Sequence, residues 1–259
     1  MSSTPSALYR YRSLSADCRR QSEEVLRDEI DLLAQGFIWV STPDKLNDPF
    51  DCRPIHSKEQ GEDLKKILSH FWVGSFSALP PDHINASPMW SYYAGNHTGI
   101  CIEFPFGETL RRKIPIEKVR YNNERFDIRS RNPARMRITA PVRPGVGIDI
   151  DEINDPENNI DILEFTRKSC AWAHEEEWRF IWRKDPYCSV DYEREMIAQY
   201  GPKHEHKVLI SQPSRVICGA DMDIRVKESI WQQLRSTGIQ LVEAKLSPSE
   251  CRVDIKYQQ

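Results

Sequence analysis

The chain has 259 residues, enough to bury one large core, and 36 basic against 39 acidic residues give a net charge of -3. This balance excludes a global positive field that would hold the protein on a polyanion, so a nucleic-acid partner would need a local basic patch. No apolar run approaches the roughly 18 residues of a membrane span, and the N-terminal residues lack the apolar core of a signal peptide. We therefore expect a soluble, cytoplasmic protein with no membrane partner.

Metal-binding patterns are weak in this sequence. The seven cysteines are scattered and never form a C-x-x-C pair, which favours reduced, buried thiols. His204 and His206 lie two residues apart without a third ligand at matching spacing, which favours a solvated loop. We predict no metal site.

The first element is a strand that carries arginines. Residues 7–14 alternate at strand period, which places Tyr9 and Tyr11 on one face and Arg10 and Arg12 on the other. The next elements follow from helical periodicity, glycine stops and β-branched runs: a helix over 22–35, a strand over 37–41, a helix over 61–70 and a strand over 71–81.

An aromatic cluster follows at Trp90, Tyr92 and Tyr93, before a turn and a buried strand over 100–104. Stacked aromatic residues are more often core than a ligand platform, but Tyr92 and Tyr93 cannot both point inward on a strand. One of the two is therefore available to stack on a flat ring, and we take Trp90 and Tyr93 as candidate cofactor-binding residues of this cluster.

Residues 121–160 change in character, because arginines are followed by an acidic run and apolar residues become sparse. This stretch is typical of a mobile, self-neutralising insertion, and the alternative is that its arginines contact phosphate. Those arginines are at positions 125, 129, 131, 135, 137 and 143.

The remaining pattern predicts helices over 162–173 and 226–238 and strands over 175–182, 214–220, 239–246 and 251–257. No Gly-x-Gly-x-x-Gly turn or Walker lysine loop is present, which argues against a Rossmann or P-loop enzyme. We predict a single α+β domain over 1–259, with largely antiparallel sheets flanked by helices.

The loop STPDKLNDPFD at 41–51 follows a buried strand. Its Asn and Asp residues are typical of turns, and Pro49 fixes one φ angle. However, the end of a buried strand would aim the Ser41 and Thr42 hydroxyls and the Asn47 amide into a cleft. The loop is therefore a candidate binding wall as well as a candidate turn.

Residues 172–180 place three consecutive carboxylates between two tryptophans. If 175–181 is extended, Glu175, Glu177 and Arg179 share one face. Two close carboxylates raise each other's pKa and an arginine opposes that shift, a combination suited to general-base or cation-stabilising chemistry. The alternative is a solvated charge run in which Glu175 and Arg179 pair on a helix.

The chain resembles the bacterial family known as domain of unknown function 2971 in four motifs, LYRYRS, GFIWVSTPDKLNDPFD, PMWSYYAGNHTGICIEF and KSCAWAHEEEWRF. The resemblance spans nearly the whole chain. That family has no settled activity, so the resemblance by itself implies no function.

A more distant similarity is to ADP-ribosyltransferase folds, which carry a basic or histidine residue on the first strand and Glu-x-Glu on a late strand. This similarity implies a split-sheet architecture and NAD as co-substrate. It implies that Arg10 or Arg12 contacts NAD, that Ser41 supports the pocket and that Tyr93 stacks near the nicotinamide. Glu177 would stabilise the positive charge that develops on the ribose, and Glu175 would orient the acceptor.

Three functions are consistent with these features. The first is an NAD-consuming ADP-ribosyltransferase or glycohydrolase, a toxin or defence effector whose acceptor is an unknown protein or nucleic acid. The second is a non-enzymatic nucleotide-binding or nucleic-acid-binding module that uses the arginines between 125 and 143. The third is a metal-dependent nuclease built on Asp48, Asp51, Glu175 and Glu177.

Overall fold

The computed structural model describes residues 4–14, 23–69, 71–107, 116–130, 137–139, 159–161, 166–183 and 207–257. None of the helices in these ranges is both long enough and apolar enough to cross a membrane. The helices and strands, in chain order, are β1 (Ala7–Arg12), α1 (Glu23–Ala34), β2 (Phe37–Trp39), the 3-10 helix η1 (Pro43–Lys45), α2 (Lys58–Leu68), β3 (Phe71–Ser77), the 3-10 helix η2 (Ile84–Ala86), α3 (Ser87–Tyr93), β4 (Ile100–Pro105), β5 (Ile116–Lys118), β6 (Arg120–Tyr121), β7 (Arg137–Thr139), β8 (Asn159–Asp161), β9 (Arg167–Lys168), the 3-10 helix η4 (Cys170–Glu175), β10 (Glu177–Arg183), β11 (Lys207–Leu209), β12 (Arg215–Cys218), α7 (Ile224–Leu234), β13 (Gln240–Leu246) and β14 (Val253–Tyr257).

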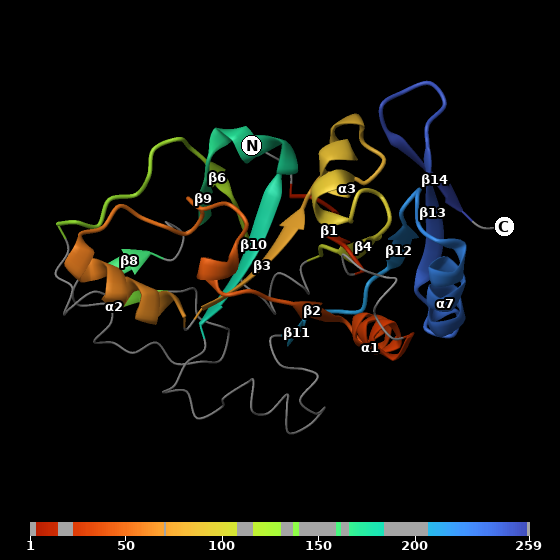
Figure 1. Ribbon diagram of the computed structural model, residues 1–259, viewed down its shortest axis with the longest axis horizontal. Coiled ribbons are helices and arrows are strands. Elements are labelled where there is room, and N and C mark those ends of the chain that lie inside the picture. The colour runs from red at the N-terminus through yellow and green to blue at the C-terminus, as the bar shows by residue number, and fades with distance from the viewer. Residues whose placement is uncertain are drawn as a thin grey trace.

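An eight-stranded sheet organises the described part of the chain, in the order β14-β13-β12-β4-β1-β3-β10-β5 (Figure 1). Its neighbouring strands are antiparallel except β12 and β13, which are parallel and are joined through α7. Three two-stranded sheets, β2 with β11, β6 with β9 and β7 with β8, accompany it. The α+β class and the largely antiparallel pairing predicted from the sequence are confirmed.

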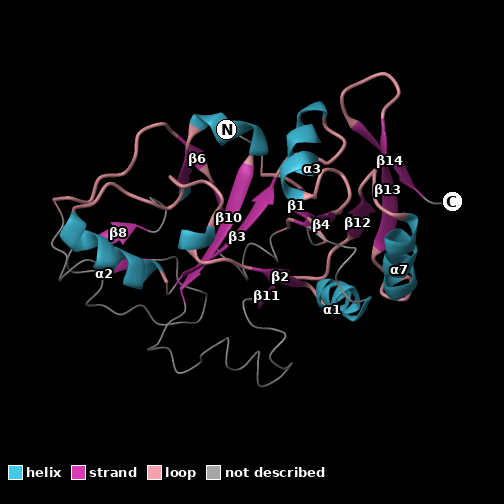
Figure 2. Cartoon of the chain, in the orientation of Figure 1, coloured by secondary structure: helices cyan, strands magenta, loops and turns pink. Residues whose placement is uncertain are grey.

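One face of the large sheet carries the largest apolar core. Leu8, Phe104 and Phe180 project from β1, β4 and β10 into this core and are completely buried. Helices α1 and α7, which lie together at one end of the molecule, contribute Ile30 and Ile230 (Figure 2). Burial of such side chains is the main source of stability, at about 25 cal/mol for each Å² of apolar surface.

The opposite face carries two smaller apolar clusters with a charged region between them. Trp90 of α3 belongs to the first cluster, and Val73 and Ile181 pack with α2 in the second. Glu177 and Arg179 project from β10 on this same face, because side chains two residues apart on a strand point the same way. Figure 1 shows β3 and β10 side by side between α2 and α3.

The aromatic segment differs from the predicted strand, because residues 87–93 form helix α3. Pro88 occupies the first turn, where a missing N–H costs no hydrogen bond, and this is a common helix start. On the helix, Trp90 points into the core and Tyr92 points to solvent. Tyr93 is half-buried.

The predicted helix over 162–173 is wrong in its described part, since 167–168 is strand β9 and 170–175 is the 3-10 helix η4. Ser169 caps η4, because its hydroxyl accepts a hydrogen bond from the Ala171 N–H. The first ten residues of the predicted insertion, 121–130, pack on the fold through the completely buried Ile128. The stretch 140–158 lies outside the described residues.

Candidate functional site

The loop over residues 41–51 meets β10 through a buried ion pair. Arg179 donates from Nη1 to Asp51 Oδ1 at 2.6 Å and from Nη2 to Oδ2 at 2.5 Å, which is a bidentate geometry. Both side chains are 1% exposed. The loop and the acidic strand therefore meet, and Asp51 makes the contact.

Glu177 lies between two cations. Arg179 donates from Nε to Glu177 Oε1 at 2.7 Å and from Nη2 to Oε2 at 3.0 Å. Lys168 of β9 donates from Nζ to the same Oε2 at 3.0 Å and to Glu175 Oε2 at 2.5 Å. Five charged side chains thus form one chain of contacts, which we call the charged cluster: Asp51, Arg179, Glu177, Lys168 and Glu175.

The charged cluster reaches the protein surface through α3. The Tyr93 hydroxyl donates to Glu175 Oε1 at 2.6 Å, and the exposed Asn47 donates from its amide nitrogen to the Tyr93 oxygen at 3.1 Å. Two of the predicted site residues, Asn47 and Tyr93, are therefore connected to the predicted carboxylate Glu175.

The backbone at Glu176 explains why Glu175 and Glu177 share a side. Glu176 adopts a left-handed conformation with φ of 45° and its side chain is exposed, whereas the residues on either side are buried. Ser77 of β3 fixes this turn, since its hydroxyl donates to the Glu175 carbonyl at 2.6 Å. The predicted shared face is present, although β10 begins at Glu177 and not at Glu175.

The two carboxylates differ in their ionisation. Burial opposes the charged form of Glu177, but the charges of Arg179 and Lys168 outweigh this effect and lower its pKa to about 2. Burial raises the pKa of Glu175, and Lys168 and Tyr93 offset only part of that rise. The pKa of Lys168 is raised, because the two carboxylates outweigh the effect of burial.

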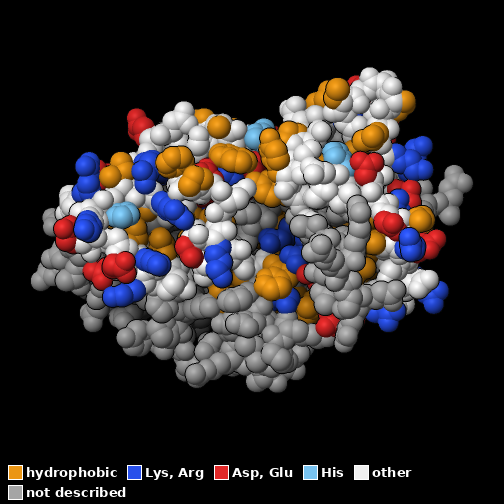
Figure 3. Space-filling view, in the orientation of Figure 1, with side chains coloured by type: hydrophobic (Ala, Val, Ile, Leu, Met, Phe, Trp, Pro, Cys, Tyr) orange, Lys and Arg blue, Asp and Glu red, His pale blue; other side chains and the backbone are white. Residues whose placement is uncertain are grey.

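A cavity of about 340 Å³ opens beside the charged cluster. Three segments line it, residues 50–54, 122–126 and 167–169, and both Lys168 and Cys52 form part of its wall. Its size lies at the lower end of the range for small-molecule sites. Figure 3 shows Lys and Arg side chains interspersed with hydrophobic ones over the surface where β6 and β9 lie in Figure 1.

The lining of this cavity is basic and aromatic. The guanidinium of Arg125 lies 5.7 Å from the Phe50 ring, and that of Arg167 lies 5.9 Å from the Phe126 ring. Arg125 also donates to the carbonyls of residues 53 and 54, and these bonds fix the position of its side chain. Because backbone carbonyls are neutral, these bonds do not neutralise the positive charge of the guanidinium. Four cationic and one acidic side chain line the cavity: Arg53, Arg125, Arg167, Lys168 and Glu124.

Arg10 and Arg12 lie on the opposite face of the sheet from Glu177. Tyr9 and Glu177 both pair with Ser77, so they share a face, and the alternate residues Arg10 and Arg12 point the other way. The NAD site that the distant similarity implied, with Arg10 or Arg12 and Glu177 around one ligand, is therefore not formed.

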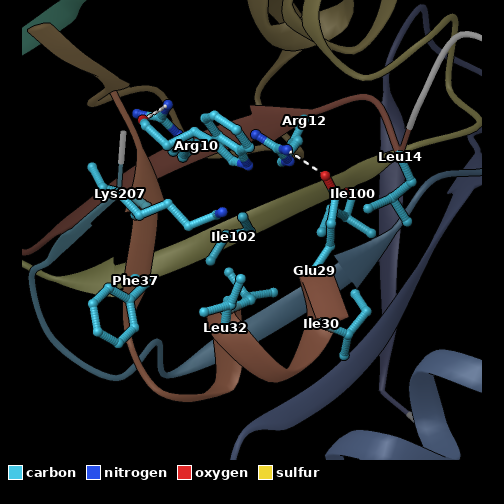
Figure 4. A pocket seen from close by; sticks show the side chains of 13 residues that line it. Arg10, Arg12, Leu14, Glu29, Ile30, Leu32, Phe37, Ile100, Ile102 and Lys207 are labelled. Atoms are coloured by element: carbon cyan, nitrogen blue, oxygen red, sulfur yellow. Dashed lines mark hydrogen bonds and ion pairs between the residues drawn. The ribbon is translucent and has the colours of Figure 1, made fainter. Parts of the chain in front are cut away.

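Arg10 and Arg12 instead line a separate small hollow (Figure 4). Arg12 bonds Glu29 at 2.8 Å, and Arg10 donates to the carbonyls of Ser75 and Trp39. The ammonium of Lys207 lies 4.3 Å from the Trp39 ring. This hollow has a volume of about 30 Å³, which is too small for a dinucleotide.

The other predicted binding residues have mixed outcomes. Trp90 is completely buried and its indole N–H donates to the Pro81 carbonyl, so it is a core residue with no surface for a ligand. Ser41 forms a backbone bridge with Val73, four positions along β3 from the residue that pairs with Glu177. Thr42 precedes η1 without a side-chain cap bond. Ligand contacts by Ser41 and Thr42 remain predictions.

The carboxylates proposed for a metal-dependent nuclease are arranged differently from a ligand set. Asp51 and Glu177 share Arg179, while Asp48 accepts a hydrogen bond from the Phe50 N–H. Among the residues that the structure describes, no group of three or more His, Cys, Asp or Glu could hold a metal ion.

Sequence reasoning missed Lys168, Arg167 and the asparagines 122 and 123, which belong to the cavity. Lys168 lies seven residues before Glu175, and the 3-10 helix η4 that brings the two together was not predicted. The composition of the sequence could have indicated this cavity, because the arginine-rich stretch begins in a segment that lines it.

The fold and site thus define an α+β protein with a buried charged cluster beside a basic cavity. The family model described as Protein of unknown function (DUF2971) matches residues 89–180, which contain every member of the charged cluster except Asp51. The match supports the resemblance over this segment, which contains the third and fourth of the four motifs almost completely. No curated protein and no solved structure matches the chain.

Proposed function

We propose that the protein binds a phosphorylated small molecule of the nucleotide class in the cavity beside Lys168. The observation that carries this proposal is the convergence of four cationic side chains on a space lined by one carboxylate. Guanidinium and ammonium groups are the usual donors to phosphate oxygens.

The aromatic and amide groups support a nucleotide over inorganic phosphate. Phe50 is 62% exposed and Phe126 is partly buried, so each retains ring surface at the cavity. Base rings stack on such faces, and asparagine amides bond base edges or sugar hydroxyls. The volume favours a mononucleotide-sized ligand, and NAD would extend beyond the cavity.

Calorimetric titration with ADP tests this proposal. We expect ADP to bind and adenosine to bind at least about 10-fold more weakly, because loss of charge-assisted bonds costs about 1.5–3 kcal/mol. Affinity for ADP should fall with added salt. Equal affinity for ADP and adenosine, or no binding of either, would refute the proposal.

Arg125→Gln supplies the variant and Arg129→Gln its matched control. Both side chains are exposed and lie four residues apart, but Arg129 is bonded to Asp127 and is not among the cavity residues. We expect Arg125→Gln to weaken ADP binding about 10-fold and Arg129→Gln to leave it unchanged.

ADP-ribosyl transfer from NAD, on a split-sheet scaffold of the transferase type, is a second and more specific proposal. It is favoured by the carboxylate pair Glu175 and Glu177, which Lys168 connects to the cavity wall. Glu177 is 4% exposed, so Lys168 would have to move before it could face a ribose.

Labelled NAD incubated with the protein and a cell lysate tests transfer. Transfer predicts nicotinamide release with a labelled product by the wild-type protein, and loss of both in a folded Glu177→Gln variant. Nicotinamide release without a labelled product indicates a glycohydrolase. No release by the wild-type protein refutes this second proposal and leaves ADP binding untouched.

A further inference from the structure

Lys168 belongs to both the cavity and the charged cluster. Its side chain is 3% exposed, it lines the cavity, and its ammonium bonds both Glu175 and Glu177. The ring of Trp172 lies 4.8 Å from the same ammonium. A phosphate group that approaches this ammonium from the cavity would share it with the two carboxylates, because two of its three N–H donors are already bonded to them.

The charged cluster already has an excess of negative charge. Three carboxylates face two cations, so the cluster carries one net negative charge when every group has its usual ionisation. A phosphate that shares Lys168 would add negative charge to a region with little water, where charges interact strongly. Protonation of one carboxylate is the simplest way to relieve that repulsion.

The geometry selects Glu175 as the group that takes the proton. Glu177 keeps two bonds from Arg179 even if Lys168 turns to a ligand, whereas Glu175 would keep only the Tyr93 hydroxyl. The directions of their pKa shifts agree, since burial raises that of Glu175 while the cations lower that of Glu177.

We infer that binding of a phosphorylated ligand in this cavity is coupled to uptake of one proton by Glu175. The inference depends on the proposed function, because it needs an anionic ligand at Lys168. The proton comes from solvent and adds to a carboxylate oxygen of Glu175, and no other bond is made or broken. Lys168 then exchanges a carboxylate partner for a phosphate oxygen.

The surroundings of Glu175 are consistent with this coupling, because one cation and one further carboxylate act on it directly. The charged and titratable groups that face it, by element, are Lys168 from β9, Tyr93 from α3, Tyr121 from β6, and Glu177 with Arg179 behind it from β10. Tyr93 connects Glu175 to the exposed Asn47, so the group is close to a source of solvent protons.

Calorimetry of ADP binding in two buffers with different ionisation enthalpies tests the inference at pH 7. We expect the wild-type protein to take up about half a proton or more for each ADP bound. Glu175→Gln should still bind ADP and should lose this uptake. Glu176→Gln is the matched control, since Glu176 is the exposed neighbour, and it should behave like the wild-type protein.

The same comparison cancels any proton that ADP itself exchanges, because the ligand is identical in all three titrations. ADP binding by the wild-type protein without proton uptake would overturn the inference and leave the proposed function standing. Equal uptake in Glu175→Gln would overturn it as well. Absence of ADP binding would overturn both, so the two failures are distinguishable even if Glu175→Gln does not fold.

Discussion

Strands β3 and β10 bury two different kinds of side chain on their two faces. On one face, Phe76 and Phe180 pack into the large apolar core. On the other, Glu177 and Arg179 lie in a buried charged cluster that separates two smaller apolar clusters. The same backbone pairing therefore supports a core made by hydrophobic burial and one made by ion pairs.

The apolar face is explained by its contribution to stability, whereas the charged face is better explained by a role in function. Apolar side chains of similar volume often replace a buried ion pair with no loss of stability, because desolvation consumes most of the electrostatic gain. Five buried charged groups are thus poorly explained by stability alone. Their position against a basic cavity favours a role in ligand binding.

The largest expected effect is a loss of stability on the charged face of the sheet that depends on pH, unlike a loss on the apolar face. Arg179→Met leaves Asp51 and Glu177 buried without their guanidinium, which should lower the free energy of unfolding by about 3–5 kcal/mol at pH 7. The deficit should shrink as pH falls, because Glu177 without the guanidinium takes up a proton more readily. Urea unfolding at pH 7 and pH 5 measures both effects.

Phe180→Ala is the matched change on the apolar face. It should also cost about 3–5 kcal/mol, because it leaves a cavity beside completely buried neighbours. Its cost should be the same at both pH values, since the change removes no titratable group. A pH-dependent loss for Phe180→Ala, or a pH-independent one for Arg179→Met, would contradict the comparison.

Glu177 should dominate the acid limb of the stability curve. Its folded pKa of about 2 lies below the ordinary 4.5, so its contribution is complete above pH 4.5 and is lost as pH falls towards 2. The contribution is on the order of 3 kcal/mol. Glu177→Gln should flatten the curve between pH 4.5 and 2, measured by denaturant unfolding, and Glu176→Gln should not.

Tyr93→Phe should have a smaller effect. The change removes a hydrogen bond to a carboxylate and the acceptor for Asn47, at a cost of about 1–2 kcal/mol. Amide hydrogen exchange in residues 46–51 should rise, because the loop loses its contact with α3. Unchanged exchange there would show that Asp51 alone holds the loop.

The smallest expected effect is at the surface. Arg129→Gln breaks an exposed ion pair with Asp127 and should leave the free energy of unfolding almost unchanged, because solvent screens such a pair. Thermal unfolding checks this expectation. A larger loss would show that residues 127–130 hold the cavity wall more firmly than their exposure indicates.

Local periodicity predicted the parts of the fold that depend on neighbouring residues. The alternation of β1 and the shared face of Glu177 and Arg179 both follow from the two-residue period of extended chain, whereas Glu175 lies on the same side because of the turn at Glu176. The helix at 87–93 was predictable from Pro88 in its first turn, but the aromatic residues around it suggested a strand.

Long-range partners were not predictable from a single sequence. Asp51 and Arg179 are 128 residues apart, and the loop motif does not indicate which strand it meets. Lys168 occurs in a motif whose acidic residues attract attention, yet its contacts depend on the turn at Glu176. The sequence alone also did not show that Arg10 and Glu177 lie on opposite faces of the sheet, because this depends on how their strands are ordered and paired.

A crystal structure grown with ADP tests the central claim most directly. We predict that ADP lies in the cavity between residues 50–54, 122–126 and 167–169, with phosphate oxygens within hydrogen-bonding distance of Arg125, Arg167 or Lys168. ADP bound elsewhere, or an empty cavity at an ADP concentration that saturates binding in solution, would contradict the claim.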